Sequence, residues 1–243
     1  MRNKCKFLLL VILILSLILL LKPDPSLLGY QDGHITPRPL TVSMAIERMP
    51  MQADLNQDGS PDCLTLYQGA ARLCANSCPC NNNSNPVWQS PPTWRIVQAG
   101  LSDLNHDGKP EISLLVWRPF QPLPIDAYRP NSGSIDAFQN KAGESCQIIL
   151  IGWRAERYQE VWAGSALAEP VLAFIALDLN SDGKQELITL DGRYEDSALR
   201  TARSLSVWRW SGFSFTSLAR LEGSFRRLEG VTLSDGSNAL LVY

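Results

Sequence analysis

The sequence predicts an all-β fold, and three observations lead to this prediction. A loop with the pattern Asp-Leu-Asn-x-Asp-Gly-x-x-acid occurs three times, within ADLNQDGSPDCLTLY at 53–67, SDLNHDGKPEISLLVW at 102–117 and LDLNSDGKQELITL at 177–190. A short run rich in aliphatic and β-branched residues follows each loop at once, as is typical of a strand. Tryptophan-rich segments with a polar turn, at 151–164 and 207–223, then read as hairpins. The chain therefore repeats one supersecondary unit.

Each unit reads as a strand, an acidic loop, a second strand and a hairpin. Strand-like runs precede two of the loops, WRIVQA at 94–99 and VLAFIAL at 171–177, and a weaker hairpin signal spans 85–100. Four strands per unit is the composition of a β-propeller blade.

A fourth, degenerate unit is predicted at 225–243. Its Asp235 and Gly236 align with the Asp-Gly of the loops, but Val231 and Leu233 replace the first two oxygen-bearing residues, so this unit should bind no metal. Residues 35–43 could add a strand to it and close the ring. The sequence thus predicts a small β-propeller of about four blades, with an open or oligomer-completed ring as the alternative.

The loop spacing fits a hard cation. Oxygens at positions 1, 3 and 5 of a tight loop converge on one side, position 7 adds a backbone carbonyl, and position 9 adds a carboxylate. Oxygen-only ligands favour Ca²⁺ over Zn²⁺, so up to three structural calcium ions are predicted. The competing interpretation is that Asp, Asn and Gly are simply good turn formers. The predicted metal-binding residues are Asp54, Asn56, Asp58, Ser60 and Asp62; Asp103, Asn105, Asp107, Lys109 and Glu111; and Asp178, Asn180, Asp182, Lys184 and Glu186.

Helical calcium modules do not fit these loops. An EF-hand needs a bidentate Glu at position 12, between two helices. Position 12 here holds Thr65, Leu114 and Thr189, and Pro61 and Pro110 lie at the entrance of strand-like runs. The loops therefore connect strands.

With these residues in view, the chain resembles FG-GAP or VCBS-type repeats, the family of integrin-like β-propellers and many bacterial surface proteins. The resemblance covers most of 44–223 and rests on the DLNxDGxxE loop. It implies calcium at the blade hairpins, in agreement with the ligand chemistry. The chain departs from the family in blade number, since such propellers usually have six or seven.

The N-terminus predicts export. Residues 7–21 read FLLLVILILSLILLL after a basic start, which is the layout of a signal peptide or a signal anchor. No pair of small residues marks a cleavage site, which favours a single-pass anchor with the rest of the chain outside the cytoplasm, and secretion after cleavage is the alternative. The predicted organisation is a hydrophobic helix at 1–22, a Pro-rich tether at 23–39 and a propeller at 40–243.

Composition excludes some functions. The chain has 22 basic and 24 acidic residues, and no acid lies within residues 1–22, so the remainder is acidic. Without a basic patch, nucleic acid is not expected as a partner. Only two histidines, His34 and His106, argue against histidine-based catalysis and His-rich metal sites.

Five cysteines lie beyond Cys5, an odd number that cannot all pair within the chain. The cluster CANSCPC at 74–80 reads as a local disulfide or as a metal site, and the pairing of Cys63, Cys74, Cys78, Cys80 and Cys146 does not follow from the sequence.

Three classes of function remain. The first is a cell-surface binding module for a protein or glycan, supported by the anchor, the repeats and a Pro- and aromatic-rich insert at 118–144 flanked by Trp117. The second is a structural component of an envelope complex. The third, and least supported, is a surface hydrolase or lyase, because the paired acids belong to the calcium loops and no nucleophile elbow or HExxH motif occurs. Catalytic residues are not predicted, the ligand-binding residues are unknown, and the tryptophans are expected to fill the inter-blade core.

Overall fold

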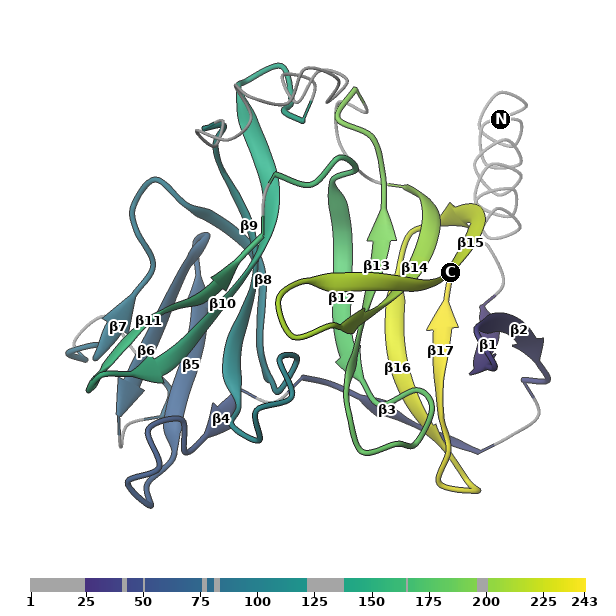
Figure 1. The fold of residues 1–243 in the computed structure, drawn as a ribbon, viewed down its shortest axis with the longest axis horizontal. Helices are drawn as coiled ribbons and strands as arrows, with labels where there is room; N and C mark the ends of the chain where they lie inside the picture. Colours follow the sequence, from purple (N-terminus) through teal and green to yellow (C-terminus); the bar gives the residue numbers. More distant parts are fainter. Residues whose placement is uncertain are drawn as a thin grey trace, which may run out of the picture.

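A computed structural model of the chain describes residues 25–40, 43–49, 51–75, 78–80, 84–121, 138–164, 166–195 and 201–243 (Figure 1). Within these ranges the chain forms strands, turns and loops and no helix, which confirms the all-β prediction. The predicted apolar helix lies outside the described residues. None of the described ranges contains a helix that is long and apolar enough to span a membrane.

The strands form four antiparallel sheets, arranged like the blades of a four-bladed β-propeller. Three sheets have four strands each and one has five. Blade 1 consists of β4 (Gln52–Ala53), β5 (Asp62–Tyr67), β6 (Ala70–Ala75) and β7 (Trp88–Gln89). Blade 2 consists of β8 (Arg95–Ser102), β9 (Glu111–Pro119), β10 (Glu144–Arg154) and β11 (Arg157–Ala163). Blade 3 consists of β12 (Val171–Leu177), β13 (Glu186–Asp191), β14 (Ala202–Trp210) and β15 (Phe215–Phe225).

Blade 4 combines strands from both ends of the described part of the chain. It contains β1 (Ser26–Gln31), β2 (His34–Arg38), β3 (Met44–Glu47), β16 (Leu228–Leu233) and β17 (Asn238–Val242), in the order β2-β1-β17-β16-β3. In the register, Leu28 lies opposite Leu240 and Val231 opposite Ile46. The predicted degenerate unit at 225–243 is therefore a strand pair, completed by N-terminal strands, and the predicted addition from residues 35–43 is confirmed for 35–38.

Two predictions from the sequence are corrected here. Residues 26–38 lie in the predicted tether but form β1 and β2, because Leu27 and Leu28 supply apolar side chains for the interior of blade 4.

The hairpin expected at 85–100 is not one: β7 belongs to blade 1 and β8 to blade 2. Pro91 and Pro92, which have no backbone N–H, lie between these strands, where the chain passes from one sheet to the next.

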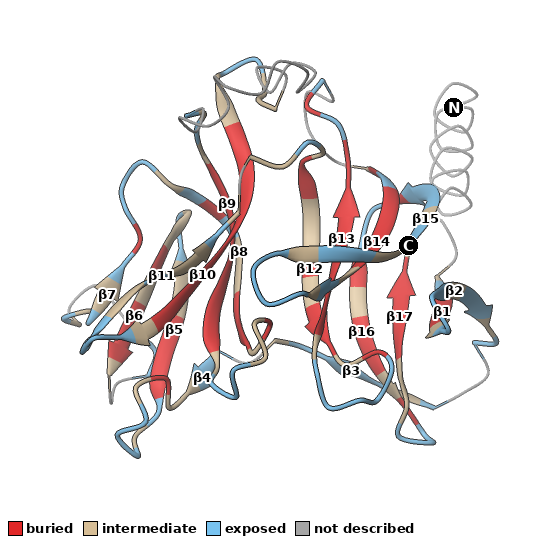
Figure 2. Ribbon diagram, viewed as in Figure 1, coloured by how far each residue is buried: buried red, intermediate tan, exposed pale blue. Residues whose placement is uncertain are grey.

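The apolar core lies mainly in the seams between blades (Figure 2). One cluster joins blades 1 and 2 through residues such as Leu73 and Ile112, a second joins blades 2 and 3, and a third joins blades 3 and 4. The fourth cluster consists of blade 4 residues alone, including Leu27 and Val231. A strand that meets a neighbouring sheet on each of its two faces buries both faces. Its sequence is then a nearly continuous apolar run, as in β9 and β10.

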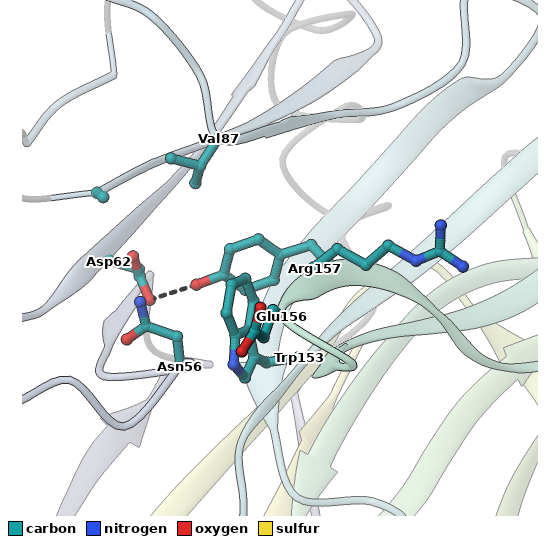
Figure 3. Close-up of a pocket in the computed structure, with 8 residues that line it drawn as sticks. Asn56, Asp62, Val87, Trp153, Glu156 and Arg157 are labelled. Carbon is teal, nitrogen blue, oxygen red and sulfur yellow. Dashed lines mark hydrogen bonds between the residues drawn. The ribbon is translucent and has the colours of Figure 1, made fainter.

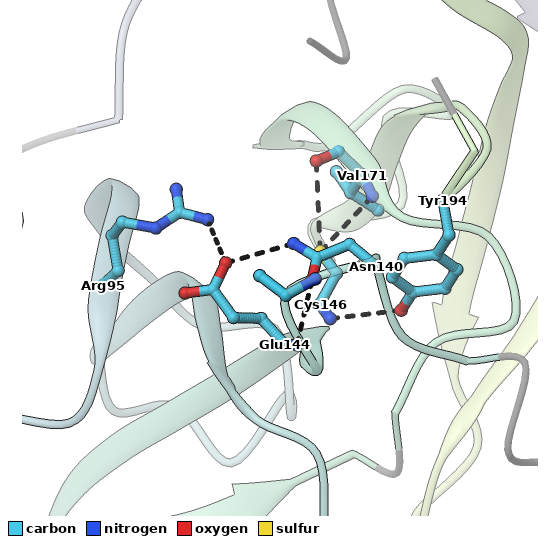
Figure 4. Close-up of polar contacts among 7 residues, drawn as sticks. Arg95, Asn140, Glu144, Cys146, Val171 and Tyr194 are labelled. Atoms are coloured by element: carbon cyan, nitrogen blue, oxygen red, sulfur yellow. Dashed lines mark hydrogen bonds and ion pairs between the residues drawn. The ribbon is translucent and has the colours of Figure 1, made fainter. Parts of the chain in front are cut away.

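Cys146 illustrates the seam between blades 2 and 3 (Figure 4). Its backbone N–H donates to the Tyr194 hydroxyl at 3.1 Å, and its sulfur accepts a hydrogen bond from the backbone N–H of Val171 at 3.4 Å. Burial raises the pKa of the Cys146 thiol to about 12. A thiol that stays protonated is a poor nucleophile, so Cys146 is a packing residue. Beside it, Glu144 accepts hydrogen bonds from Arg95 and Asn140.

The remaining described cysteines form two disulfides in blade 1, Cys63–Cys78 and Cys74–Cys80. With Cys146 free and buried, this pairing accounts for the odd number of cysteines after residue 5. The disulfide interpretation of the CANSCPC cluster is confirmed.

The correction at residues 26–38 can be tested by stability. Leu28→Ala should lower the free energy of unfolding by about 2–5 kcal/mol, because it opens a cavity in the seam between blades 3 and 4. The matched change Leu40→Ala, at an exposed position, should change it by less than about 0.5 kcal/mol. Chemical denaturation measures both; equal effects would mean that residues 26–38 act as a tether.

Candidate metal sites

The three acidic loops, hereafter loop 1 (54–62), loop 2 (103–111) and loop 3 (178–186), have the same internal hydrogen bonds. In loop 1, the carboxylate of Asp54 accepts bonds from the backbone N–H groups of Asp58 (3.0 Å) and Gly59 (2.9 Å). The corresponding distances are 3.1 and 3.0 Å in loop 2 and 3.2 and 2.9 Å in loop 3. The first Asp therefore fixes the turn. The three loops have similar sequences and adopt the same geometry.

The backbone of each loop is left-handed at positions 4 and 6. Position 4 has a φ of 61° at Gln57, 59° at His106 and 61° at Ser181. The glycine at position 6 has a φ between 81° and 89° in all three loops, a conformation that costs glycine little. This requirement explains why glycine recurs at position 6.

The leucine at position 2 anchors each loop in a seam. Leu55 belongs to the cluster between blades 1 and 2, Leu104 to that between blades 2 and 3, and Leu179 to that between blades 3 and 4. Each is at most 4% exposed. In the fourth loop the aligned residue is Thr232, and the cluster on that side contains blade 4 residues alone. The leucine at position 2 therefore packs in the seam. This role accounts for its place in the repeated pattern, which ligand chemistry does not explain.

Loop 2 brings three carboxylates together. Ligand oxygens of Asp103, Asp107 and Glu111 lie within 4.8 Å of one another, and this is the single such acidic group among the described residues. Glu111 is only 2% exposed. Its Oε1 accepts a hydrogen bond from the Asn105 amide, whereas its Oε2 is buried with no partner. An unpaired buried carboxylate oxygen is costly, and a cation is the partner that would remove that cost.

The electrostatics of loop 2 agree with this geometry. Burial, and then the neighbouring charges of Asp107 and Asp103, raise the pKa of Glu111 to about 8, against a smaller opposing effect of the Asn105 hydrogen bond. Three acids that repel one another in a partly dry site favour protonation or a bound cation. The residues of loop 2 therefore fit a divalent cation.

In loops 1 and 3 the acid at position 9 also bonds to the backbone. Asp62 Oδ2 accepts hydrogen bonds from the Leu55 N–H at 3.1 Å and from the Tyr158 hydroxyl at 2.8 Å. Glu186 Oε2 accepts one from the Leu179 N–H at 3.0 Å, and burial is the main cause that raises the pKa of Glu186. Among the described residues, the acidic side chains of loop 2 are the ones that converge within 4.8 Å, and the ligand sets of loops 1 and 3 stay predictions. Ser60, Lys109 and Lys184, at position 7, donate a backbone N–H to the acid at position 5.

The fourth loop lacks this arrangement. Asp235 accepts hydrogen bonds from the N–H and hydroxyl of Ser237, at 2.9 and 2.6 Å. Val231 and Leu233, which occupy positions 1 and 3, are buried in the blade 4 cluster. Their side chains carry no oxygen, so the loop offers one carboxylate and no ligand set.

Adjacent loops are joined by side chains that sequence reasoning missed. Gln185 of loop 3 accepts the backbone N–H of Asp103 at its Oε1 (2.8 Å), and its carbonyl oxygen accepts a bond from the His106 ring (2.8 Å). The Asn238 amide donates to the Asp178 carbonyl oxygen at 2.7 Å. His106 therefore bridges two blades. No local pattern marks these residues, because each partner lies 60 or more positions away.

Most of the aromatic insert at 118–144 lies outside the described residues, so the surface expected there stays a prediction. Trp117 is 7% exposed and packs with Phe138 in the cluster between blades 2 and 3, with its ring edge-on to Tyr194 at 5.8 Å. Residues 122–137 lie outside the described residues. Trp117 and Phe138 are therefore core residues, whereas Phe120 is half-buried and belongs to none of the described clusters.

No protein-family model, no curated protein and no solved structure matches the chain. The resemblance to FG-GAP repeats therefore rests on the loop residues themselves and on the propeller-like placement of the four sheets.

The buried acid of loop 2 predicts a pH dependence in calcium-free protein. The pKa of Glu111 rises from an ordinary 4.5 to about 8 on folding, so its ionisation opposes folding increasingly between these values. Stability should therefore fall as pH rises from 5 to 8. Glu111→Gln should match the wild type near pH 5 and be more stable near pH 8, as measured by chemical denaturation after metal removal. Parallel pH profiles for the two proteins would contradict the assignment.

Proposed function

We propose that this protein is an extracytoplasmic, calcium-stabilised β-propeller of the FG-GAP/VCBS type that acts as a binding module for a protein or glycan at the cell surface. The observation that carries the calcium part is the loop geometry: three loops with one hydrogen-bond pattern, the second with a buried Glu111 oxygen that lacks a partner.

Calcium suits the donors better than other cations. Each loop offers oxygen at positions 1, 3, 5 and 9, with the backbone carbonyl of position 7 as the proposed fifth ligand. The Asn105 amide nitrogen donates to the carboxylates of Asp107 and Glu111, so it occupies the place of a positive charge. A calcium ion would compete with this amide for the same oxygens, and the Asn105 amide would then have to present its oxygen instead.

The proposed ions would stabilise the blades and not only the loops. Loop 2 is bonded to loop 3 through Gln185, and loop 3 to blade 4 through Asn238. Leu55, Leu104 and Leu179 tie each loop to the seam beneath it. Calcium that fixes one loop therefore restrains the contact with the next blade, a structural and not a catalytic role.

Two features support a location outside the cytoplasm. Both disulfides of blade 1 suit an oxidising compartment, and the apolar segment at 7–21 with its basic flank suits an export signal or a membrane anchor. Millimolar extracellular calcium is sufficient for weak loop sites.

A cavity supports the binding role. It has a volume of about 310 Å³ and lies between loop 1 and the β10–β11 hairpin, lined by aromatic, aliphatic and charged side chains of two blades. Pockets of this size, with a few polar groups converging on an apolar wall, are typical of small-ligand sites. The cavity favours a binding module over a purely structural envelope component.

Calcium binding is tested by thermal unfolding of the folded portion of the chain. Chelation should lower the melting temperature and added Ca²⁺ should restore it, since each site contributes about 2.7 kcal/mol at a hundredfold excess of calcium over its Kd. The absence of any chelator effect would remove calcium from the proposal.

A matched pair of variants assigns the effect to the loops. Asp182→Ala removes the position-5 ligand of a complete set and should reduce the calcium-dependent rise in melting temperature. Asp235→Ala changes the corresponding Asp of the fourth loop and should leave that rise unchanged. If both variants reduce it equally, the ligand assignment is wrong.

A further inference from the structure

The cavity beside loop 1 combines three kinds of side chain (Figure 3). The wall from blade 2 carries Trp153 and Tyr158, directly opposite each other in the β10–β11 register, with ring centroids 4.8 Å apart and planes at 58°. Val87 and Ala75 of blade 1 also line the cavity. Polar groups complete the lining, and these are Asn56, Asp62, Glu156 and Arg157.

The tryptophan of this pair belongs to none of the apolar clusters in the described part of the chain. Trp153 is half-buried at the end of β10 and absent from the clusters that fill the seams, whereas Trp208 lies in the seam between blades 2 and 3. Part of its ring therefore remains available at the cavity, and Trp153 differs from the core tryptophans that the sequence predicts.

The tight β10–β11 turn places Glu156 in the lining of the cavity. Ala155 and Glu156 form the tip of the β10–β11 hairpin, and both have left-handed backbones, with φ of 50° and 59°. Positive φ at both positions is what a two-residue type I′ hairpin loop requires, because its twist matches that of the flanking strands. In the described structure, Glu156 makes no hydrogen bond or ion pair, so its carboxylate is free to accept bonds from a ligand.

The charges of the cavity select against strongly charged ligands. Asp62 and Glu156 would repel an anion. With loop 1 loaded, a cation would meet a calcium ion nearby. The aromatic residues also line one wall alone, so they form no cage around an ammonium group. A ligand that is fully apolar would cover the Glu156 carboxylate without giving it a hydrogen-bond donor.

We propose that this cavity binds one or two units of a neutral sugar. The apolar face of a pyranose ring would pack on Trp153, and its hydroxyls would bond to the carboxylate of Glu156 and to the amide of Asn56. A volume of about 310 Å³ lies at the small end of the range for ligand sites.

The inference rests on the proposed calcium-stabilised binding module, because Asn56 and Asp62 belong to loop 1. Tyr158 donates its hydroxyl proton to Asp62 at 2.8 Å and thereby connects the aromatic wall to the loop. Calcium in loop 1 would fix the two polar side chains, so sugar binding should be stronger with calcium than with a chelator.

The test is calorimetric titration of the purified protein in calcium with neutral trisaccharides: cellotriose, maltotriose, mannotriose and chitotriose. At least one should bind with a Kd near about 1 mM or lower. Trp153→Ala and Glu156→Gln should each weaken binding by about tenfold or more. Glu195→Gln, at an exposed glutamate that does not line this cavity, should leave the Kd unchanged.

The outcomes separate this inference from the calcium proposal. If no neutral trisaccharide binds, if Trp153→Ala binds as well as the wild type, or if sialyllactose or an alkylammonium ion binds instead, the sugar site is wrong. The calcium-dependent melting shift would remain in those cases. If sugar binding depends on Trp153 and Glu156 but calcium does not change the melting temperature, the sugar site is supported and the calcium proposal is contradicted.

Discussion

The carboxylate of the first Asp in each loop is the constraint on which the other features depend. In loops 1 to 3 it accepts two consecutive backbone N–H groups, which closes a turn that only a left-handed position 4 and a glycine at position 6 can complete. The closed turn directs the leucine at position 2 into the seam and, in loop 2, keeps the carboxylates of Asp103 and Asp107 beside Glu111. Strand pairing, seam packing and the proposed ion site thus share one local geometry.

Blade 4 differs from blades 1 to 3 both in the residues of its loop and in the packing of its apolar side chains. The three blades with complete loops each place a leucine in the seam shared with the next blade. Blade 4 has Thr232 at that position, loses the oxygens at positions 1 and 3, and has apolar residues in a cluster of its own. The last blade instead depends on β1 and β2, which bring Leu27 and Leu28 from the start of the described chain to its end. Blade 4 thus takes its strands from both ends of the described chain.

The sequence predicted the features that are encoded locally. The three loops, the strands on either side of them and the degenerate unit at 225–243 follow from residue type and spacing, and the structure has them at those positions. The error at 26–38 arose because four prolines in a short stretch indicate a tether, whereas long-range pairing with β17 decides the conformation. The bonds through Gln185, Tyr158 and Asn238 could not be predicted, because they join residues that only the arrangement of blades brings together. Trp153 was assigned to the core for the same reason, since a sequence cannot show which tryptophan lies at the end of a hairpin beside a cavity.

Direct measurement of bound calcium tests the central claim most sharply. Metal-free protein titrated with Ca²⁺ in a calorimeter should bind up to three ions, and a variant with Asn in place of Asp107 should bind at least one fewer, because loop 2 would lose a charged ligand where the three carboxylates meet. A protein that takes up no calcium at millimolar concentration, or a variant that binds as many ions as the wild type, would contradict the account.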